Sequence, residues 1–107
     1  RKNYFYPDLP NGYQITQFDQ PIALAGKVEI EINNEFKNIG ITRVHMENDA
    51  GKLTHTKNGT LCDYNRAGTP LIEIVTDPDL RSPEEAQAFA KEVQKIVRFV
   101  GSSDADM

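Results

Sequence analysis

Alternating apolar and polar positions predict that much of this chain is β-strand. In residues 28–32 three apolar side chains alternate with two glutamates, which is the period of a half-buried strand. Asn33 and Asn34 follow, and asparagine tolerates the positive φ that a tight turn needs. We therefore expect the chain to return antiparallel through about residues 38–46, after an earlier short strand at residues 13–18.

A second hairpin and one more strand are predicted in the middle of the chain. Asn58-Gly59 is a strong tight-turn signal, so residues 52–56 and 60–64 are expected to pair. The segment PLIEIVT, residues 70–76, carries apolar side chains on both faces of its period-two pattern. This pattern predicts a strand that is covered on both faces.

The last third of the chain predicts one long amphipathic helix. Ser82 is suited to cap the N-terminus, Pro83 fits the first helical position, and Glu85 completes a capping box. Apolar residues then recur at helical spacing, at Ala86, Phe89, Ala90, Val93, Ile96, Val97 and Val100. Gly101 is suited to end the helix. A helix of about 18 residues lying on an antiparallel sheet predicts an α+β fold.

Composition and charge restrict the classes of function. The 107 residues are 38% hydrophobic and 26% charged, which is typical of a globular chain and suits one domain or a piece of one. Twelve basic and sixteen acidic residues leave a net charge of −4. A contact with nucleic acid would therefore depend on a local basic cluster rather than on an overall positive field.

The single cysteine and the short apolar runs restrict the kinds of site and the cellular environment that we expect for this chain. The single Cys62 excludes an internal disulfide and a multi-cysteine zinc site, and we expect it to be a small core residue in a reduced, cytoplasmic protein. The apolar runs are too short to cross a membrane. Neither end resembles the natural start or finish of a protein, so we expect an internal segment of something longer.

One predicted strand carries an unusual run of polar side chains on a single face. Alternation places Arg43, His45 and Glu47 on the side of Ile41. That face is either solvated, which the pattern alone favours, or it lines a polar cleft. In the second interpretation Glu47 holds a hard cation such as Mg²⁺ while Arg43 or His45 contacts phosphate oxygens. Mg²⁺ prefers few carboxylates together with the phosphates of a substrate.

Glu73 is isolated in an otherwise apolar strand. It shares a face with Leu71 and Val75, and a buried carboxylate without a partner is costly. One interpretation is a salt bridge to a nearby arginine. The other is a second metal carboxylate that faces Glu47 across the sheet.

Cationic and aromatic residues are further candidates for contacts with phosphate or RNA. Lys52 follows an Asp-Ala-Gly turn that is not a P-loop, and Arg66 lies in the loop NRAG. Both are either plain surface residues or phosphate ligands. Arg1 and Lys2 precede Tyr4 and two more aromatic residues, and such a cluster can bind RNA by charge and stacking. Packing of these aromatic residues in a core is the more common outcome.

Three blocks of the sequence resemble the B-subunit family of aspartyl/glutamyl-tRNA amidotransferases. They are RKNYFYPDLPNGYQITQFDQPI, IGITRVHMENDAGK and DYNRAGTPLIEIVTDPDLRSPEEA, each without gaps and in the family's order. The likeness runs from Arg1 to about Glu85 and continues more loosely to Met107. It implies an α+β catalytic cradle similar to the glutamine synthetase and guanido kinase folds. Residues 1–107 would be one partial domain from its middle.

The same resemblance implies a reaction and its components. In the family, the B subunit uses ATP and Mg²⁺ to phosphorylate the side-chain carboxylate of misacylated Glu-tRNA(Gln) or Asp-tRNA(Asn). Ammonia from a glutaminase A subunit then displaces the phosphate, and a small C subunit usually completes the complex. Metal and cationic groups are needed to spread the charge of the transferring phosphoryl group.

The resemblance also implies which residues bind the metal. The family's metal carboxylates fall at Glu47 and Glu73, and Asn48 stands where the family motif HMEEDAGK has a second glutamate. An amide oxygen can still coordinate Mg²⁺, so Asn48 is a third candidate. Family strands that supply further metal-site groups lie outside this sequence, so we expect the segment alone to be inactive. The alternative is a non-catalytic tRNA-binding module.

Overall fold

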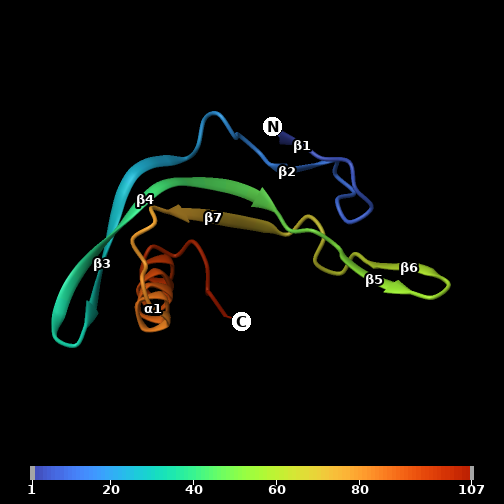
Figure 1. The fold of residues 1–107 in the computed structure, drawn as a ribbon. Coiled ribbons are helices and arrows are strands. Elements are labelled where there is room, and N and C mark those ends of the chain that lie inside the picture. The colour runs from blue at the N-terminus through green and yellow to red at the C-terminus, as the bar shows by residue number, and fades with distance from the viewer. Residues whose placement is uncertain (1, 107) are drawn as a thin grey trace. The chain divides into compact units, whose positions relative to one another are not determined.

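The computed structural model describes residues 2–106, which form seven strands and one helix (Figure 1). In chain order these are β1 (Lys2–Asn3), β2 (Tyr13–Ile15), β3 (Ala23–Ile32), β4 (Glu35–Asn48), β5 (Lys52–Thr56), β6 (Gly59–Asp63), β7 (Pro70–Thr76) and α1 (Pro83–Phe99). One sheet has the order β1-β2-β4-β3 with β7 also paired to β4, and β5 and β6 form a second sheet. The predicted α+β class, with antiparallel sheets and one C-terminal helix, is confirmed.

The turn between β3 and β4 forms as its sequence predicts. Asn33 and Asn34 have φ values of 53° and 63°, the left-handed pair that closes a two-residue hairpin. Both strands extend beyond their predicted bounds. Ladder bonds continue past the alternating stretch, and the Ile22 amide still donates to the Val44 carbonyl at 2.8 Å. In contrast, β2 ends at Ile15 rather than at residue 18.

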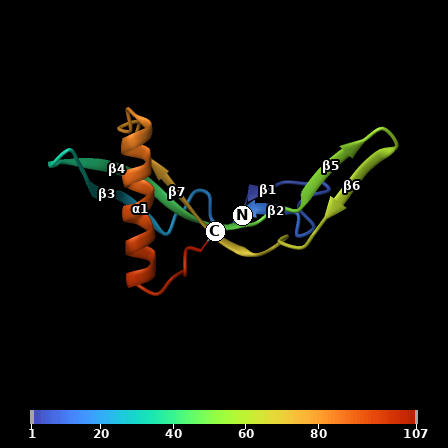
Figure 2. The same cartoon turned by 90° about the horizontal axis from the view of Figure 1, so that it is seen from below.

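The second hairpin is shifted by one residue on its far strand. Thr56 pairs with Gly59 across a two-residue loop, and Lys52 pairs with Asp63 at the open end. Figure 2 shows the two strands as a separate ribbon. Cys62 is exposed on this ribbon, so the expectation that it is a core residue is wrong. A two-stranded sheet has no second layer that could bury it.

The chain divides into two compact units. The first contains Arg1–Leu24 and Arg43–Ile74, and the second contains Ala25–Thr42 and Val75–Met107. In the first unit Leu9, Ile15 and His45 are buried. In the second unit the buried side chains are Ile30, Ile39 and Ile41. The prediction that residues 1–107 form one partial domain stays a prediction.

β7 has the predicted bounds but not the predicted burial. Leu71 and Glu73 are half-buried, whereas Ile72 on the opposite face is 46% exposed. The expectation that both faces are covered along the whole strand is therefore wrong, because Ile72 is exposed while Ile74 on the same face is half-buried.

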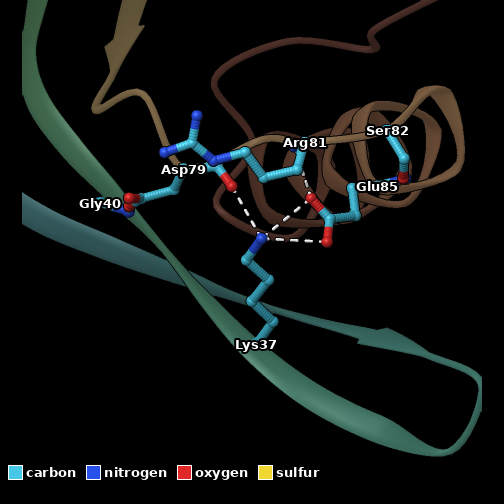
Figure 3. A network of polar contacts seen from close by, with 6 residues as sticks. All are labelled: Lys37, Gly40, Asp79, Arg81, Ser82 and Glu85. Carbon is cyan, nitrogen blue, oxygen red and sulfur yellow. Dashed lines mark hydrogen bonds and ion pairs between the residues drawn. The ribbon is translucent and has the colours of Figure 1, made fainter.

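The N-terminus of α1 is built as predicted and is tied to β4. The Ser82 Oγ accepts a hydrogen bond from the Glu85 amide at 3.2 Å, and Pro83 opens the helix. The Glu85 carboxylate accepts from the Arg81 amide at 2.7 Å and from Lys37 Nζ at 2.9 Å (Figure 3). The same Lys37 Nζ donates to the Asp79 carbonyl at 2.7 Å.

The apolar face of α1 is covered less than predicted. No residue of the helix is buried, and Phe99 at its last position is 93% exposed. α1 is the only helix among residues 2–106, and it is neither long nor apolar enough to cross a membrane.

Candidate metal and phosphate site

The polar face of β4 is enclosed rather than solvated. His45 is 1% exposed and Arg43 and Glu47 are half-buried, while Thr42 and Met46 on the other face are exposed. The interpretation of this face as a solvated strand end is therefore wrong. The predicted alternation of side chains along β4 is confirmed. The face that carries Arg43, His45 and Glu47 is the covered face.

Phe18, from the loop after β2, covers part of this face. Its ring lies parallel to the His45 ring with a centroid distance of 5.9 Å, and Arg43 Cζ lies 6.0 Å from the Phe18 centroid. Arg43 Nε and both ring nitrogens of His45 are buried without a hydrogen-bond partner among the described residues. Buried polar atoms without partners are rare in folded proteins. Arg43 Nε therefore retains an unused donor, and the His45 ring retains at least one, because an imidazole always carries a proton on one nitrogen.

Glu47 and Glu73 meet on the neighbouring strands β4 and β7. Their carboxylates lie close enough for Glu73 to act on the pKa of Glu47, and Glu47 accepts a hydrogen bond from Gln14 Nε2 at 2.6 Å. Burial raises the pKa of Glu47, and the contact with Glu73 and the charges of Glu73 and Asp49 raise it further, while the Gln14 bond lowers it. Two carboxylates on paired strands can together bind one divalent cation.

Glu73 does not have the arginine partner that one interpretation required. None of the ion pairs found within residues 2–106 includes Glu73. Those residues also hold no group of three or more His, Cys, Asp or Glu side chains arranged for a metal. The site therefore offers two carboxylates, a number that suits Mg²⁺ because this ion retains waters and binds substrate phosphates.

The other candidate metal ligand, Asn48, is placed differently. Its Oδ1 accepts a hydrogen bond from Asn11 Nδ2 at 3.2 Å. Alternation along β4 directs its side chain away from that of Glu47. The structure brings Glu47 and Glu73 together but does not bring Asn48 to them.

Lys52 and Arg66 line a separate small cavity. Its volume is about 220 Å³, and its walls are Asp49, Ala50, Gly51, Lys52, Asp63, Asn65 and Arg66. Arg66 Nη2 lies 2.9 Å from Asp49 Oδ2, so its charge is already compensated. Lys52 is exposed at the start of β5. Their proposed contact with phosphate or RNA stays a prediction.

The aromatic residues near the N-terminus are on the surface. Tyr4 and Tyr6 stack with a centroid distance of 4.7 Å and are 41% and 58% exposed. The expectation that they pack in a core is wrong. Arg1 lies outside the described residues, as does the side chain of Lys2. The RNA-binding role of this cluster therefore stays a prediction.

Sequence reasoning missed Gln14 entirely. Gln14 lies in β2, where Ile15 pairs with Glu47, and it donates a side-chain hydrogen bond of 2.6 Å to Glu47. The only signal was its position in a short strand between Tyr13 and Ile15. That signal could not identify a partner 33 residues away.

Comparison with known proteins agrees with the three sequence blocks. The family described as the GatB/GatE catalytic domain matches residues 1–107. The chain is 59% identical over 108 residues to the B subunit of the aspartyl/glutamyl-tRNA(Asn/Gln) amidotransferase of Geobacillus kaustophilus, and 60% identical over 108 residues to that of Oceanobacillus iheyensis. Each alignment covers 100% of this chain and 23% of the relative. The chain therefore belongs to the GatB/GatE catalytic domain family.

Proposed function

We propose that the protein containing this chain activates the side-chain carboxylate of a misacylated tRNA with ATP and Mg²⁺. The substrates are Glu-tRNA(Gln), Asp-tRNA(Asn) or both, and the product is the corresponding amide. The observation that carries this proposal is that two half-buried glutamates, Glu47 and Glu73, lie on the paired strands β4 and β7. The names of the relatives, which are amidotransferase B subunits, support the same reaction class.

The chemistry requires an activated carboxylate. A substrate carboxylate oxygen attacks the γ-phosphorus of ATP, the bond to the bridging oxygen breaks, and ADP leaves. Ammonia then attacks the acyl carbon, the bond to the phosphate oxygen breaks, and inorganic phosphate leaves with loss of a proton from nitrogen. Mg²⁺, when bound, neutralises charge on the phosphate oxygens during the transfer.

The residues of this chain can bind both the cation and the phosphate, because the covered face of β4 carries both acidic and basic side chains. Glu47 and Glu73 would hold the cation, because a divalent ion between neighbouring carboxylates offsets their mutual repulsion. Arg43 and His45 lie on the same face and hold unused hydrogen-bond donors. They would contact the phosphate oxygens that the cation also binds.

The remaining components of the proposal follow from the family. The partners are a glutaminase A subunit, which supplies ammonia, and a small C subunit, in a cytoplasmic heterotrimer. The whole catalytic domain would have a cradle similar to the glutamine synthetase and guanido kinase folds. Because the chain spans 23% of the length of its relatives, we infer that the segment alone lacks catalytic activity.

A second candidate is a non-catalytic tRNA-binding module. The stacked and exposed pair of Tyr4 and Tyr6 favours it, since exposed aromatic rings are platforms for unpaired bases. The two candidates differ in their dependence on the carboxylates, because RNA binding by stacking does not need Glu47 or Glu73.

Substitution of the two glutamates tests the proposal in the full-length protein with its partner subunits. Glu47→Gln and Glu73→Gln should each lower ATP-dependent amidation by about 100-fold or more, because each removes a metal carboxylate. Glutamine hydrolysis by the partner should remain. Amidation is measured as conversion of Glu-tRNA to Gln-tRNA. Binding of Mn²⁺ is measured by electron paramagnetic resonance of the free ion.

Glu92→Gln provides a matched control for this experiment. Glu92 lies on α1 and pairs only with Lys95, at 2.9 Å, among the interactions described. It should retain normal amidation and normal Mn²⁺ affinity. If both active-site variants amidate like the wild type, the assignment of the site is wrong.

A further inference from the structure

We propose that Gln14 is a positioning residue for Glu47, and that its side-chain amide holds the carboxylate in the orientation that receives a divalent cation. This inference rests on the function proposed above, and it assigns a role to a residue outside the predicted site. It concerns a single contact, from Gln14 Nε2 to Glu47 Oε1, with a length of 2.6 Å.

The backbone that follows Gln14 is bonded to β4. Ile15 pairs with Glu47 in the ladder between β2 and β4, and the Ile15 side chain is buried. Thr16 donates two bonds to the Met46 carbonyl, from its amide and from its hydroxyl, each 3.1 Å long. The Gln14 amide is therefore presented by a fixed strand rather than by a mobile loop.

The bond from Gln14 distinguishes the two oxygens of Glu47. Oε1 accepts from the amide, so one of its lone pairs is occupied and rotation of the carboxylate is restricted. Glu73 lies on the paired strand β7 and would share the cation. A neighbour that orients a ligating carboxylate typically contributes 10-fold to 100-fold to metal affinity, or about that range in activity.

Gln14 supplies the side-chain donor that the described residues place on Glu47. A donor bonded to one oxygen of a ligating carboxylate holds that ligand in place. Removal of this donor should therefore weaken cation binding even if the fold is retained.

Gln14→Met tests the role, because methionine has a similar length and carries no donor. In the full-length protein with its partners, the Kd for Mn²⁺ should rise by about 10-fold. The KM for Mg²⁺ should rise by about the same factor, while kcat at saturating Mg²⁺ should stay within about threefold. Thr16→Val is the matched control, since it removes one bond between the same strand and β4 without touching Glu47.

Gln14→Glu provides a readout that a purely structural role would not produce. This variant keeps the size of the side chain but adds a third carboxylate beside Glu47 and Glu73. Its thermal midpoint should fall without metal, because like charges repel, and should recover on addition of Mn²⁺. The Thr16→Val protein should show no more recovery with Mn²⁺ than the wild type. If Gln14→Met does not fold, Gln14→Glu alone tests the role of Gln14.

Two outcomes would overturn the inference, and they are distinguishable. If Glu47→Gln loses Mn²⁺ binding while Gln14→Met keeps the wild-type Kd and Gln14→Glu shows no Mn²⁺-dependent recovery, the role of Gln14 is wrong and the proposed function stands. If Glu47→Gln and Gln14→Met both bind Mn²⁺ and amidate like the wild type, the proposed site is wrong, and the role of Gln14 is wrong with it.

Discussion

At the residue scale, Gly40 lies where β4 passes closest to the segment that leads into α1. Its amide donates to Asp79 Oδ2 at 2.8 Å, and its carbonyl accepts from the Asp77 amide at 2.9 Å. A Cβ built on Gly40 would meet the Asp77 carboxylate and lie 2.8 Å from its Cγ. This position has no space for a side chain, because the amide and the carbonyl of Gly40 are both bonded to the segment that follows β7.

Gly40→Ala should therefore destabilise the chain. We expect a loss of about 1–3 kcal/mol in the free energy of unfolding, because overpacking forces either the Asp77 side chain or the backbone to move. Urea denaturation followed by circular dichroism measures it. Gly26→Ala is the control, since a Cβ there would lie at an ordinary 3.6 Å from the Ile41 Cβ. Equal stability of the two variants would contradict the explanation.

At the element scale, α1 is joined to β4 through a charged network at its first turn. Lys37 on β4 contacts the Glu85 carboxylate and the Asp79 carbonyl, and the Arg81 amide donates to the same carboxylate (Figure 3). The bond from the Arg81 amide lowers the pKa of Glu85, and Lys37 lowers it further. The ionised form of Glu85 therefore stabilises the folded state relative to the unfolded one.

The sign of this shift predicts how stability depends on pH. A carboxyl group whose pKa is lowered on folding contributes stability above its unfolded pKa, and that contribution is lost as the pH falls through the folded value. Stability should therefore decline as the pH falls below the ordinary value of 4.5. In Glu85→Gln this part of the decline should be absent, as measured by urea denaturation between neutral and acidic pH.

Glu84→Gln is the control for the helix terminus as a whole. Glu84 lies in the same first turn of α1 but is exposed. It should keep the acid decline of the wild type. An unchanged acid decline in Glu85→Gln would show that the network does not contribute to stability in this range.

At the scale of the whole molecule, much apolar surface of this chain is left uncovered. Phe99 and Val100 near the end of α1 are exposed, and so are Phe36 on β4 and Leu24 on β3. The chain aligns with less than a quarter of its relatives' length. These apolar side chains are therefore left exposed by residues 2–106.

Residues 1–107 alone should not amidate misacylated tRNA. The reason is that the chain aligns with only 23% of the length of the relatives that are named as amidotransferase subunits. The test adds this segment to the glutaminase partner, ATP, Mg²⁺ and Glu-tRNA(Gln), and measures formation of Gln-tRNA. Turnover comparable to that of the full protein would contradict the prediction.

Residues 1–107 alone can also test the second candidate function, a non-catalytic tRNA-binding module. A tRNA-binding module should bind tRNA at low salt with an affinity that falls as salt rises. Tyr4→Ala should weaken that binding if the stacked tyrosines take part, which fluorescence anisotropy can measure. Absence of binding at low salt would remove this candidate.

Local signals in the sequence determined the elements and the family of this protein. Asn33-Asn34, the Ser82 cap and the bounds of β7 were all predictable, because turn conformation, capping and alternation depend on neighbouring residues. The sequence suggested that Glu47 and Glu73 face each other. Glu73 is isolated in an apolar strand, and Glu47 lies on a strand face with an unusual run of polar side chains. Motif blocks indicated the family, which the comparison with relatives confirmed.

Only the tertiary structure decided which faces are covered and which side chains meet. Phe18 encloses the polar face of β4, and Gln14 reaches Glu47 across 33 residues of sequence. Conversely, Ile72 and the Tyr4–Tyr6 pair remain exposed although their residue types favour burial. Burial and long-range contacts depend on which segments pack together, and that is a property of the whole fold rather than of any local pattern.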